Sequence, residues 1–362
     1  MHPTIPLIAG FGLPHHSFAL QGPFEDSEWR TVLEAISEQR VLGLALAACE
    51  AGVLLLGPVQ RDQLLARCEA AMASVLQLEA MLAEVSQDFA NAEIDSRVLK
   101  GSATARLDYP DVQWREFGDV DVMVHGADFG AATRILERHG CQRRFGEPRP
   151  GFTARFGKGA CFVAPNGLEI DLHRSFVAGP FAALGDDVRL WLDAETFLIG
   201  DTRLRALPRE LRLVHAALHA VLGKLTPRLV PLRDVAQIAS VTDHEPVIAL
   251  AHQLDVASVL ARAVLQASSI MQLQETVQLD ALARWAFSYQ PTRRQRQMVR
   301  VYTNAQRSYL GQVRAGVRAV PGVANKVSYA RALLLPDREY LASRDESYRR
   351  RLLRAVGRGR PQ

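Results

Sequence analysis

The spacing of apolar residues changes twice along this chain, and these two changes constrain its fold more than any other feature of the sequence. Residues 28–90 repeat apolar side chains three and four positions apart, as amphipathic helices do. From about residue 96 the chain consists of short β-branched or alternating segments bounded by glycine, proline and asparagine, which predict strands. After Pro180 the helical spacing returns and continues to about residue 356. The pattern predicts an α+β protein, in which a small mixed-sheet core is flanked by N-terminal and C-terminal helical regions.

The predicted strands come from six segments: "SRVLKG", "GDVDVMV", "CQRRF", "FTARF", "ACFVA" and "LEIDLHR". One predicted helix, "ADFGAATRILERHG", interrupts them and ends at Gly140 as its C′ residue. We therefore expect three consecutive parts in the 362-residue chain. These are a helical region over residues 1–90, an α/β core over residues 91–180, and a helical region with a basic tail over residues 181–362.

The net charge of +4 is unevenly distributed. The segment from Pro291 to Gln362 has 17 lysine and arginine residues against 4 aspartate and glutamate residues, a net +13 that leaves −9 for the rest of the chain. Such a segment can bind an anionic partner, or it can be the solvated face of arginine-rich helices. The sequence leaves both interpretations open.

The sequence also limits the cellular location that we expect. No apolar run approaches the roughly 18 residues of a membrane-spanning helix, and the N-terminus lacks the basic and apolar regions of a secretory signal. The cysteines do not have the spacing of a metal site; they are Cys49, Cys68, Cys141 and Cys161. We expect a cytoplasmic protein with reduced thiols.

Two aspartates interrupt the apolar segment "GDVDVMV". Side chains alternate between the two faces of a strand, so Asp119 and Asp121 point the same way while the valines point to the core. In "LEIDLHR" the same alternation places Asp171 and His173 together on the polar face. If the two strands are neighbours, three carboxylates converge.

Three carboxylates that lie so near one another repel each other unless a cation neutralises their charge. Oxygen ligands suit a hard divalent ion, so we expect Mg²⁺, with Mn²⁺ as an alternative, bound by Asp119, Asp121 and Asp171. Two such ions can stabilise the attacking and leaving oxygens of a phosphoryl transfer. His173 can hydrogen-bond a ligating carboxylate, or it can be a polar histidine at the rim of the sheet. A solvent-facing strand is the structural alternative for the aspartates.

The segment "LKGSA" precedes a short helix-like run that ends at Leu107. A Gly-Ser turn at this position offers backbone N–H groups and a hydroxyl to a phosphate, although an ordinary turn has the same residues. Lys100 and Arg115 supply positive charge in the same part of the sequence. Further along, His215 and His219 have a spacing that can ligate zinc, but we expect them to pack between helices, where Asp234 can contact them.

Together, "LKGSA", "GDVDVMV" and "LEIDLH" resemble the motifs of the polymerase-beta-type nucleotidyltransferase superfamily. The narrower likeness is to an uncharacterised bacterial nucleotidyltransferase family with Lys-Gly, Asp-Ile-Asp and Ile-Asp-Leu-His motifs. It extends over about residues 28–345 and is most specific within residues 98–174. Sixteen residues separate Ser102 from Asp119, more than is usual in the superfamily, and the insertion "LDYPDVQWREFG" agrees with the narrower family.

The resemblance implies a role for each motif. Gly101 and Ser102, with Lys100 and Arg115 near them, would bind the triphosphate of a nucleotide. Asp119 and Asp121 would bind the metal ions, and Asp171 would complete the metal site and help to activate the acceptor.

These features predict a Mg²⁺-dependent nucleotidyltransferase. It would transfer a nucleoside monophosphate from an NTP to an acceptor hydroxyl or phosphate and release pyrophosphate. The acceptor can be a small molecule or a hydroxyl of a peptide or protein. RNA is less favoured, because no basic stretch is interleaved with aromatic residues. The alternatives are a non-catalytic scaffold with this fold, a nucleic-acid-binding protein, and an enzyme whose donor is a sugar nucleotide or another phosphate-linked compound.

Overall fold

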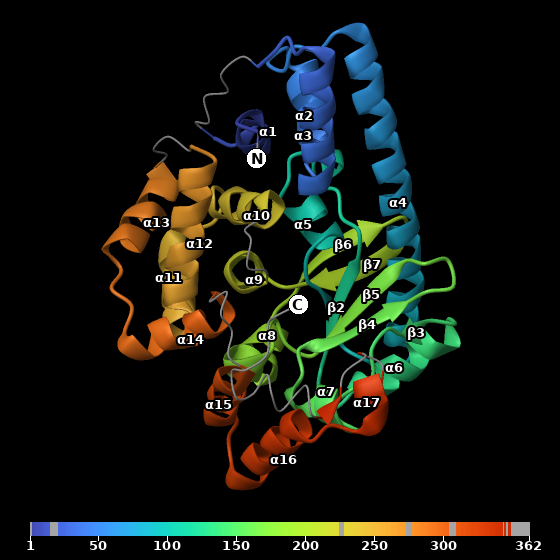
Figure 1. Cartoon of the computed structure of the whole chain (residues 1–362), viewed down its shortest axis with the longest axis vertical. Helices are drawn as coiled ribbons and strands as arrows, with labels where there is room; N and C mark the ends of the chain where they lie inside the picture. The colour runs from blue at the N-terminus through green and yellow to red at the C-terminus, as the bar shows by residue number, and fades with distance from the viewer. Residues whose placement is uncertain are drawn as a thin grey trace. The chain divides into compact units, whose positions relative to one another are not determined.

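The computed structural model describes residues 2–14, 21–223, 228–272, 277–303, 309–342, 344, 347 and 348 (Figure 1). Its strands form one mixed sheet in the order β3-β4-β5-β2-β1-β7-β6. The strands are β1 (Ser96–Val98), β2 (Val120–Val124), β3 (Gln142–Arg143), β4 (Gly159–Val163), β5 (Glu169–His173), β6 (Glu195–Ile199) and β7 (Thr202–Ala206). The predicted α+β class is confirmed.

Helices account for most of the remaining described chain. They are α1 (Thr4–Gly10), α2 (Asp26–Gln39), α3 (Leu42–Glu50), α4 (Pro58–Asn91), α5 (Ser102–Leu107), α6 (Phe129–Arg138), α7 (Phe152–Phe156), α8 (Arg189–Leu192), α9 (Arg209–Leu222), α10 (Leu229–Ala239), α11 (His244–Gln253), α12 (Ala257–Ile270), α13 (Val277–Ser288), α14 (Arg293–Thr303), α15 (Tyr309–Ala319), α16 (Val323–Leu334) and α17 (Arg338–Ala342), with 3₁₀ turns η1 (Val112–Trp114) and η2 (Gly179–Asp186). None of the helices in the described part of the chain has the length and apolar character needed to cross a membrane.

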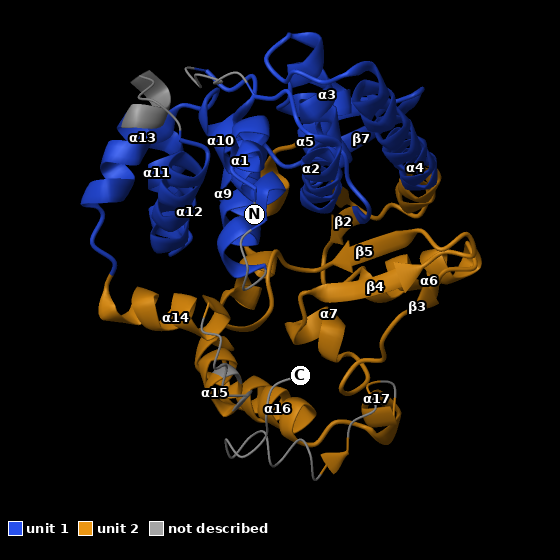
Figure 2. Ribbon diagram, turned by 45° about the horizontal axis from the view of Figure 1, so that its top comes forward, with its two compact units in different colours: residues 1–83, 98–120, 195–291 blue, residues 84–97, 121–194, 292–362 orange. Residues whose placement is uncertain are grey.

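The chain forms two compact units (Figure 2). Unit 1 comprises Met1–Ala83, Val98–Val120 and Glu195–Pro291, and unit 2 comprises Glu84–Arg97, Asp121–Ala194 and Thr292–Gln362. Each unit therefore combines segments from all three of the parts expected from the sequence. The three-part division describes order along the chain and stays a prediction.

Unit 1 contains most of the helical core. Helix α10 packs against α9 and α12, and all of its residues are buried. The strands β6 and β7 form an antiparallel hairpin, and β1 runs parallel to β7, with Val98 opposite Ala206. The hairpin corrects the sequence analysis, which expected only helices after Pro180. The alternation in "ETFLIGDTRLRA" and its two-residue Gly-Asp turn favour a hairpin over a helix.

Unit 2 contains the strands that carry the aspartate motifs. The strands β3, β4 and β5 form an antiparallel meander, and β5 lies beside β2 in the sheet. The segment "FTARF" is helix α7 rather than the predicted strand, because the chain enters it through Gly151 in the left-handed conformation and forms a short helical turn.

Helix α6 is amphipathic, and its buried apolar face consists of Phe129, Ala132, Ile135 and Leu136. It ends as the sequence predicts. Gly140 has φ +76°, its N–H donates to the Glu137 carbonyl at 2.9 Å, and the Cys141 N–H donates to the Leu136 carbonyl at 3.0 Å. These two bonds form a Schellman motif, which favours glycine because of the positive φ.

Candidate active site

A buried cluster of two carboxylates and one imidazole lies in unit 2. Asp121 comes from β2, and Asp171 and His173 come from the neighbouring strand β5. One ligand atom from each of the three lies within 4.8 Å of the other two. His173 Nε2 lies 2.8 Å from Asp121 Oδ1, and these two side chains are only 3% and 1% exposed. Asp171 is half-buried.

The strand arrangement explains why these residues meet. Alternation along β5 places Asp171 and His173 on one face, and the sheet order places β5 directly beside β2. The expected adjacency of the two aspartate-bearing strands is therefore present. The alternative of a solvent-facing strand does not hold for Asp121, because every residue of β2 is buried. Asp121 is consequently far less exposed than an aspartate on an open strand face.

The donor set fits a divalent cation. Two carboxylates that approach this closely in a buried setting repel each other, and a cation between them removes that penalty. Carboxylate oxygens suit Mg²⁺, and the nearby imidazole is also compatible with Mn²⁺. Because His173 already contacts Asp121, it also suits the role of orienting that carboxylate.

Cys161 lies next to this cluster, opposite Asp171 in the β4–β5 register. Burial, together with the negative charges of Asp171 and Glu169, raises the pKa of Cys161 to about 12. Without a bound cation, the thiol is therefore protonated at neutral pH.

Asp119, the first aspartate of the motif, belongs to unit 1 and lies one residue before β2. Its carboxylate is 3.2 Å from Lys100 Nζ and 3.9 Å from an Arg40 guanidinium nitrogen. The sequence analysis anticipated positive charge from Lys100 but did not identify Arg40, which lies 79 residues away and has no local signal. That Asp119 shares a metal ion with Asp121 and Asp171 stays a prediction.

The Gly-Ser turn lies at the start of α5. Gly101 has φ +57°, and a Cβ on it would lie 3.1 Å from the Phe117 ring, so glycine is required there. Ser102 is 2% exposed, and its hydroxyl donates to the Glu79 carboxylate. Arg106, one turn further along α5, also donates to Glu79, at 2.6 Å and 3.1 Å. The Ser102 hydroxyl therefore already has a carboxylate partner.

Arg115 was expected near the nucleotide, but its guanidinium pairs with Asp234. Nε donates to Oδ1 at 2.7 Å and Nη2 to Oδ2 at 2.9 Å, and the Tyr109 hydroxyl also donates to Oδ1 at 2.9 Å. The Arg115 and Asp234 side chains are 5% and 4% exposed. Burial would lower the pKa of Arg115, but Asp234 outweighs it and holds that pKa above the ordinary value. This pair links two segments of unit 1 and needs no nucleotide to explain it.

His215 and His219 lie along α9 with their rings stacked, 6.4 Å apart and 14° from parallel. Within the described residues, the Asp121 cluster is the only group of three or more histidine, cysteine or carboxylate side chains arranged to hold a metal ion. Asp234 accepts hydrogen bonds from Arg115 and Tyr109. These observations agree with the packing role expected for this region.

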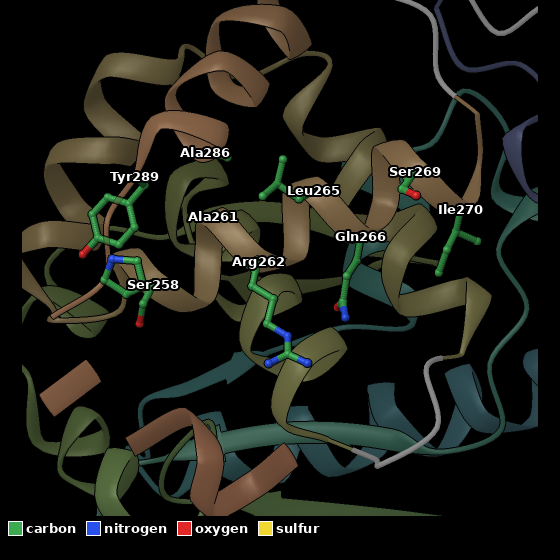
Figure 3. A pocket seen from close by; sticks show the side chains of 10 residues that line it. Ser258, Ala261, Arg262, Leu265, Gln266, Ser269, Ile270, Ala286 and Tyr289 are labelled. Carbon is green, nitrogen blue, oxygen red and sulfur yellow. The ribbon is translucent and has the colours of Figure 1, made fainter. Parts of the chain in front are cut away.

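A separate hollow of about 420 Å³ runs along α12 and α13 in unit 1 (Figure 3). Figure 3 shows Arg262 and Gln266 on the same side of α12, whereas the Leu265 side chain points away from them. No aspartate or glutamate is among the described residues that line it, so this hollow lacks the carboxylates of a Mg²⁺ site.

Comparison with known proteins places the chain in a family. A family model described as uncharacterised nucleotidyltransferase matches residues 25–304. None of the curated proteins matches. A similar solved structure is the crystal structure of an antigenic nucleotidyltransferase-like protein from Paracoccidioides brasiliensis, with 17% sequence identity and a TM-score of 0.36, over 57% of this chain and 96% of that one. Because the family model matches most of the chain, the protein belongs to this uncharacterised nucleotidyltransferase family.

Proposed function

We propose that the protein is a divalent-cation-dependent nucleotidyltransferase that transfers a nucleoside monophosphate from an NTP to an acceptor hydroxyl or phosphate. The observation that carries the proposal is the buried cluster of Asp121, Asp171 and His173, whose ligand atoms lie within 4.8 Å of one another. Membership of the nucleotidyltransferase family supports it.

In this proposal Asp121 and Asp171 hold the cation, and Asp119 contributes from the residue before β2. When bound, a cation such as Mg²⁺ offsets the negative charge of the carboxylates and the triphosphate and acidifies the acceptor hydroxyl. His173 orients Asp121 through their 2.8 Å contact.

Lys100 and Arg40 attract the triphosphate, because they place two positive charges around Asp119. Gly101 and Ser102 contribute main-chain N–H groups, since the Ser102 hydroxyl is occupied by Glu79. Arg115 has no part in the proposed site, because its charge is matched by Asp234 inside the fold.

The reaction itself is an in-line displacement. The acceptor oxygen attacks the α-phosphorus, the bond to the oxygen that bridges the α- and β-phosphates breaks, and pyrophosphate leaves with that electron pair. The acceptor proton passes to Asp171 or to water. Asp171 is the better placed of the two cluster carboxylates, because it is half-buried whereas Asp121 is buried. A cation bound to Asp171 would make this carboxylate a weaker base. A weak base would be enough, because the same cation would lower the pKa of the acceptor hydroxyl.

Melting curves with and without nucleotide test the proposal. ATP, GTP, CTP and UTP, each with Mg²⁺, are added to the parent protein, to Asp121→Asn and to Asp128→Asn. Asp128 is also in unit 2, at the start of α6, and its side chain forms no capping bond, so its replacement is a matched change of charge. We expect at least one NTP to raise the melting temperature of the parent and of Asp128→Asn but not of Asp121→Asn.

The protein without nucleotide supplies a second readout. Asp121→Asn removes one of two repelling charges, so this variant should be at least as stable as the parent without ligand. Asp171→Asn provides an independent variant if Asp121→Asn does not fold. Equal NTP stabilisation in the parent and in both cluster variants would contradict the metal site. A parent that no NTP stabilises would favour the scaffold or another donor.

A further inference from the structure

A cavity of about 530 Å³ lies in unit 2 where the strands of the Asp121 cluster end. His125 is the first residue after β2, and Arg174 is the first residue after β5. The opposite walls come from α7, through Arg155, and from α16, through Asn325. Pockets of roughly 300–1,000 Å³ bind small molecules, so the size of this cavity fits a small ligand rather than a folded partner.

One wall of the cavity is fixed by Arg174. This side chain is 2% exposed, and its guanidinium donates to Asp186 at 2.6 Å, to the Ala182 carbonyl at 2.8 Å and to the Gly157 carbonyl at 3.2 Å. The charge of Arg174 is matched by Asp186. Arg174 therefore gives the wall its shape but adds no net charge to it.

Arg155 has a different environment. Its Nη2 donates to the neutral Asn325 amide oxygen at 2.8 Å, and its guanidinium carbon lies 4.9 Å from the centre of the Phe156 ring. Among the described residues, Arg155 forms no ion pair. Its positive charge is thus held in position by two uncharged groups at an exposed edge of the cavity. A guanidinium placed in this way is suited to bind an oxyanion.

The strands connect this cavity to the metal-site cluster. His125 lies four residues after Asp121, and Arg174 lies three residues after Asp171, which is roughly 10–13 Å along the strand direction. We propose that the cavity binds the phosphate or carboxylate of a small acceptor through Arg155, with the reactive hydroxyl of the acceptor extending towards Asp121 and Asp171. This assignment names the acceptor class and rests on the proposed function.

The test measures binding of small hydroxylated oxyanions without nucleotide. Glycerol 3-phosphate and glycerate are titrated by calorimetry, with glycerol as the uncharged control. Arg155→Gln removes the charge. Asn325→Asp keeps the shape of the side chain and places a carboxylate against Arg155. Both variants should bind the preferred oxyanion about ten-fold or more weakly, because each loses a charge-assisted contact.

Two matched variants control for the change in net charge. Arg138→Gln alters an exposed arginine in the last turn of α6, away from the cavity lining. Asn166→Asp keeps the oxygen that accepts from the Leu168 N–H at 3.2 Å in the turn before β5. Both controls should bind within two-fold of the parent. The stronger of the two probes identifies the anionic group as phosphate or carboxylate.

The site assignment is overturned if neither oxyanion binds the parent more tightly than glycerol does, or if Arg155→Gln and Asn325→Asp bind like their controls. Melting curves with NTP and Mg²⁺ on the same proteins separate this failure from that of the proposed function. Arg155→Gln should lose oxyanion binding yet keep stabilisation by NTP. Oxyanion binding that depends on Arg155, in a parent that no NTP stabilises, would support the cavity site and reject its role in nucleotidyl transfer.

Discussion

Replacing Arg115 with methionine should destabilise the protein strongly and leave NTP binding intact. The side chain is 5% exposed, and its two bonds to Asp234 measure 2.7 Å and 2.9 Å. Without the guanidinium, Asp234 keeps the Tyr109 hydroxyl at 2.9 Å but loses its charge partner inside the fold. Removing one member of a buried ion pair costs about 3–5 kcal/mol.

A double-mutant cycle separates the cost of the unpaired charge from the loss of packing. Asp234→Leu alone should also be costly, because it leaves Arg115 buried without its carboxylate. The double variant Arg115→Met with Asp234→Leu leaves neither charge buried, so it should cost less than the sum of the single changes, with a coupling of about 1–3 kcal/mol. Tyr109→Phe calibrates the scale, since it removes one hydrogen bond worth about 1 kcal/mol.

Urea unfolding followed by circular dichroism gives the free energies of unfolding, and melting curves with ATP and Mg²⁺ give the nucleotide readout. The structural role of Arg115 predicts a lower free energy of unfolding together with the same ligand-induced rise in melting temperature. The reasoning is refuted if Arg115→Met loses less than about 1 kcal/mol of stability and no longer responds to ATP, because Arg115 would then act on the nucleotide.

Two further outcomes can be measured on the same material. Ser102→Ala should reduce the free energy of unfolding by about 1–2 kcal/mol, because Ser102 donates a hydrogen bond to the buried Glu79 carboxylate. The same change should alter NTP affinity by less than about three-fold. A ten-fold loss of affinity at unchanged stability would instead show that the hydroxyl binds the phosphate. Burial raises the pKa of Glu116 above the ordinary 4.5, although the hydrogen bond from the Leu42 N–H acts to lower that pKa. The folded state therefore favours the protonated form of Glu116. The free energy of unfolding of the parent should therefore fall as pH rises from 4.5 towards that higher pKa, and Glu116→Gln should flatten this part of the pH profile. A variant with the same pH profile as the parent would show that another group causes the fall.

Local patterns in the sequence predicted the parts of the fold that depend on near neighbours. Alternation placed Asp171 and His173 on one face of β5, and the glycine signal at residue 140 placed the end of α6 correctly. The hairpin of β6 and β7 was also readable from its alternation and Gly-Asp turn, but the surrounding helical regions obscured it. The strand expected over "FTARF" was wrong because five residues carry too little periodicity to separate a strand from a helical turn.

Local sequence patterns could not predict contacts between residues that are far apart in the sequence. Asp119 pairs with Arg40, Ser102 with Glu79, and Arg115 with Asp234, across sequence separations of 79, 23 and 119 residues. Each pairing is set by how the elements pack, and no spacing rule links the two partners. Charge type alone could therefore not distinguish Lys100, which contacts Asp119, from Arg115, which is buried against Asp234.

The position of the metal tests the central claim most directly. Crystals grown with Mn²⁺ and a non-hydrolysable α,β-methylene analogue of the preferred NTP are measured near the manganese absorption edge. An anomalous difference map should contain a peak bounded by the carboxylates of Asp121 and Asp171, the two carboxylates of the 4.8 Å cluster, with triphosphate oxygens completing its coordination. A map in which the analogue is bound and manganese is absent from Asp121 and Asp171 would contradict the proposed active site.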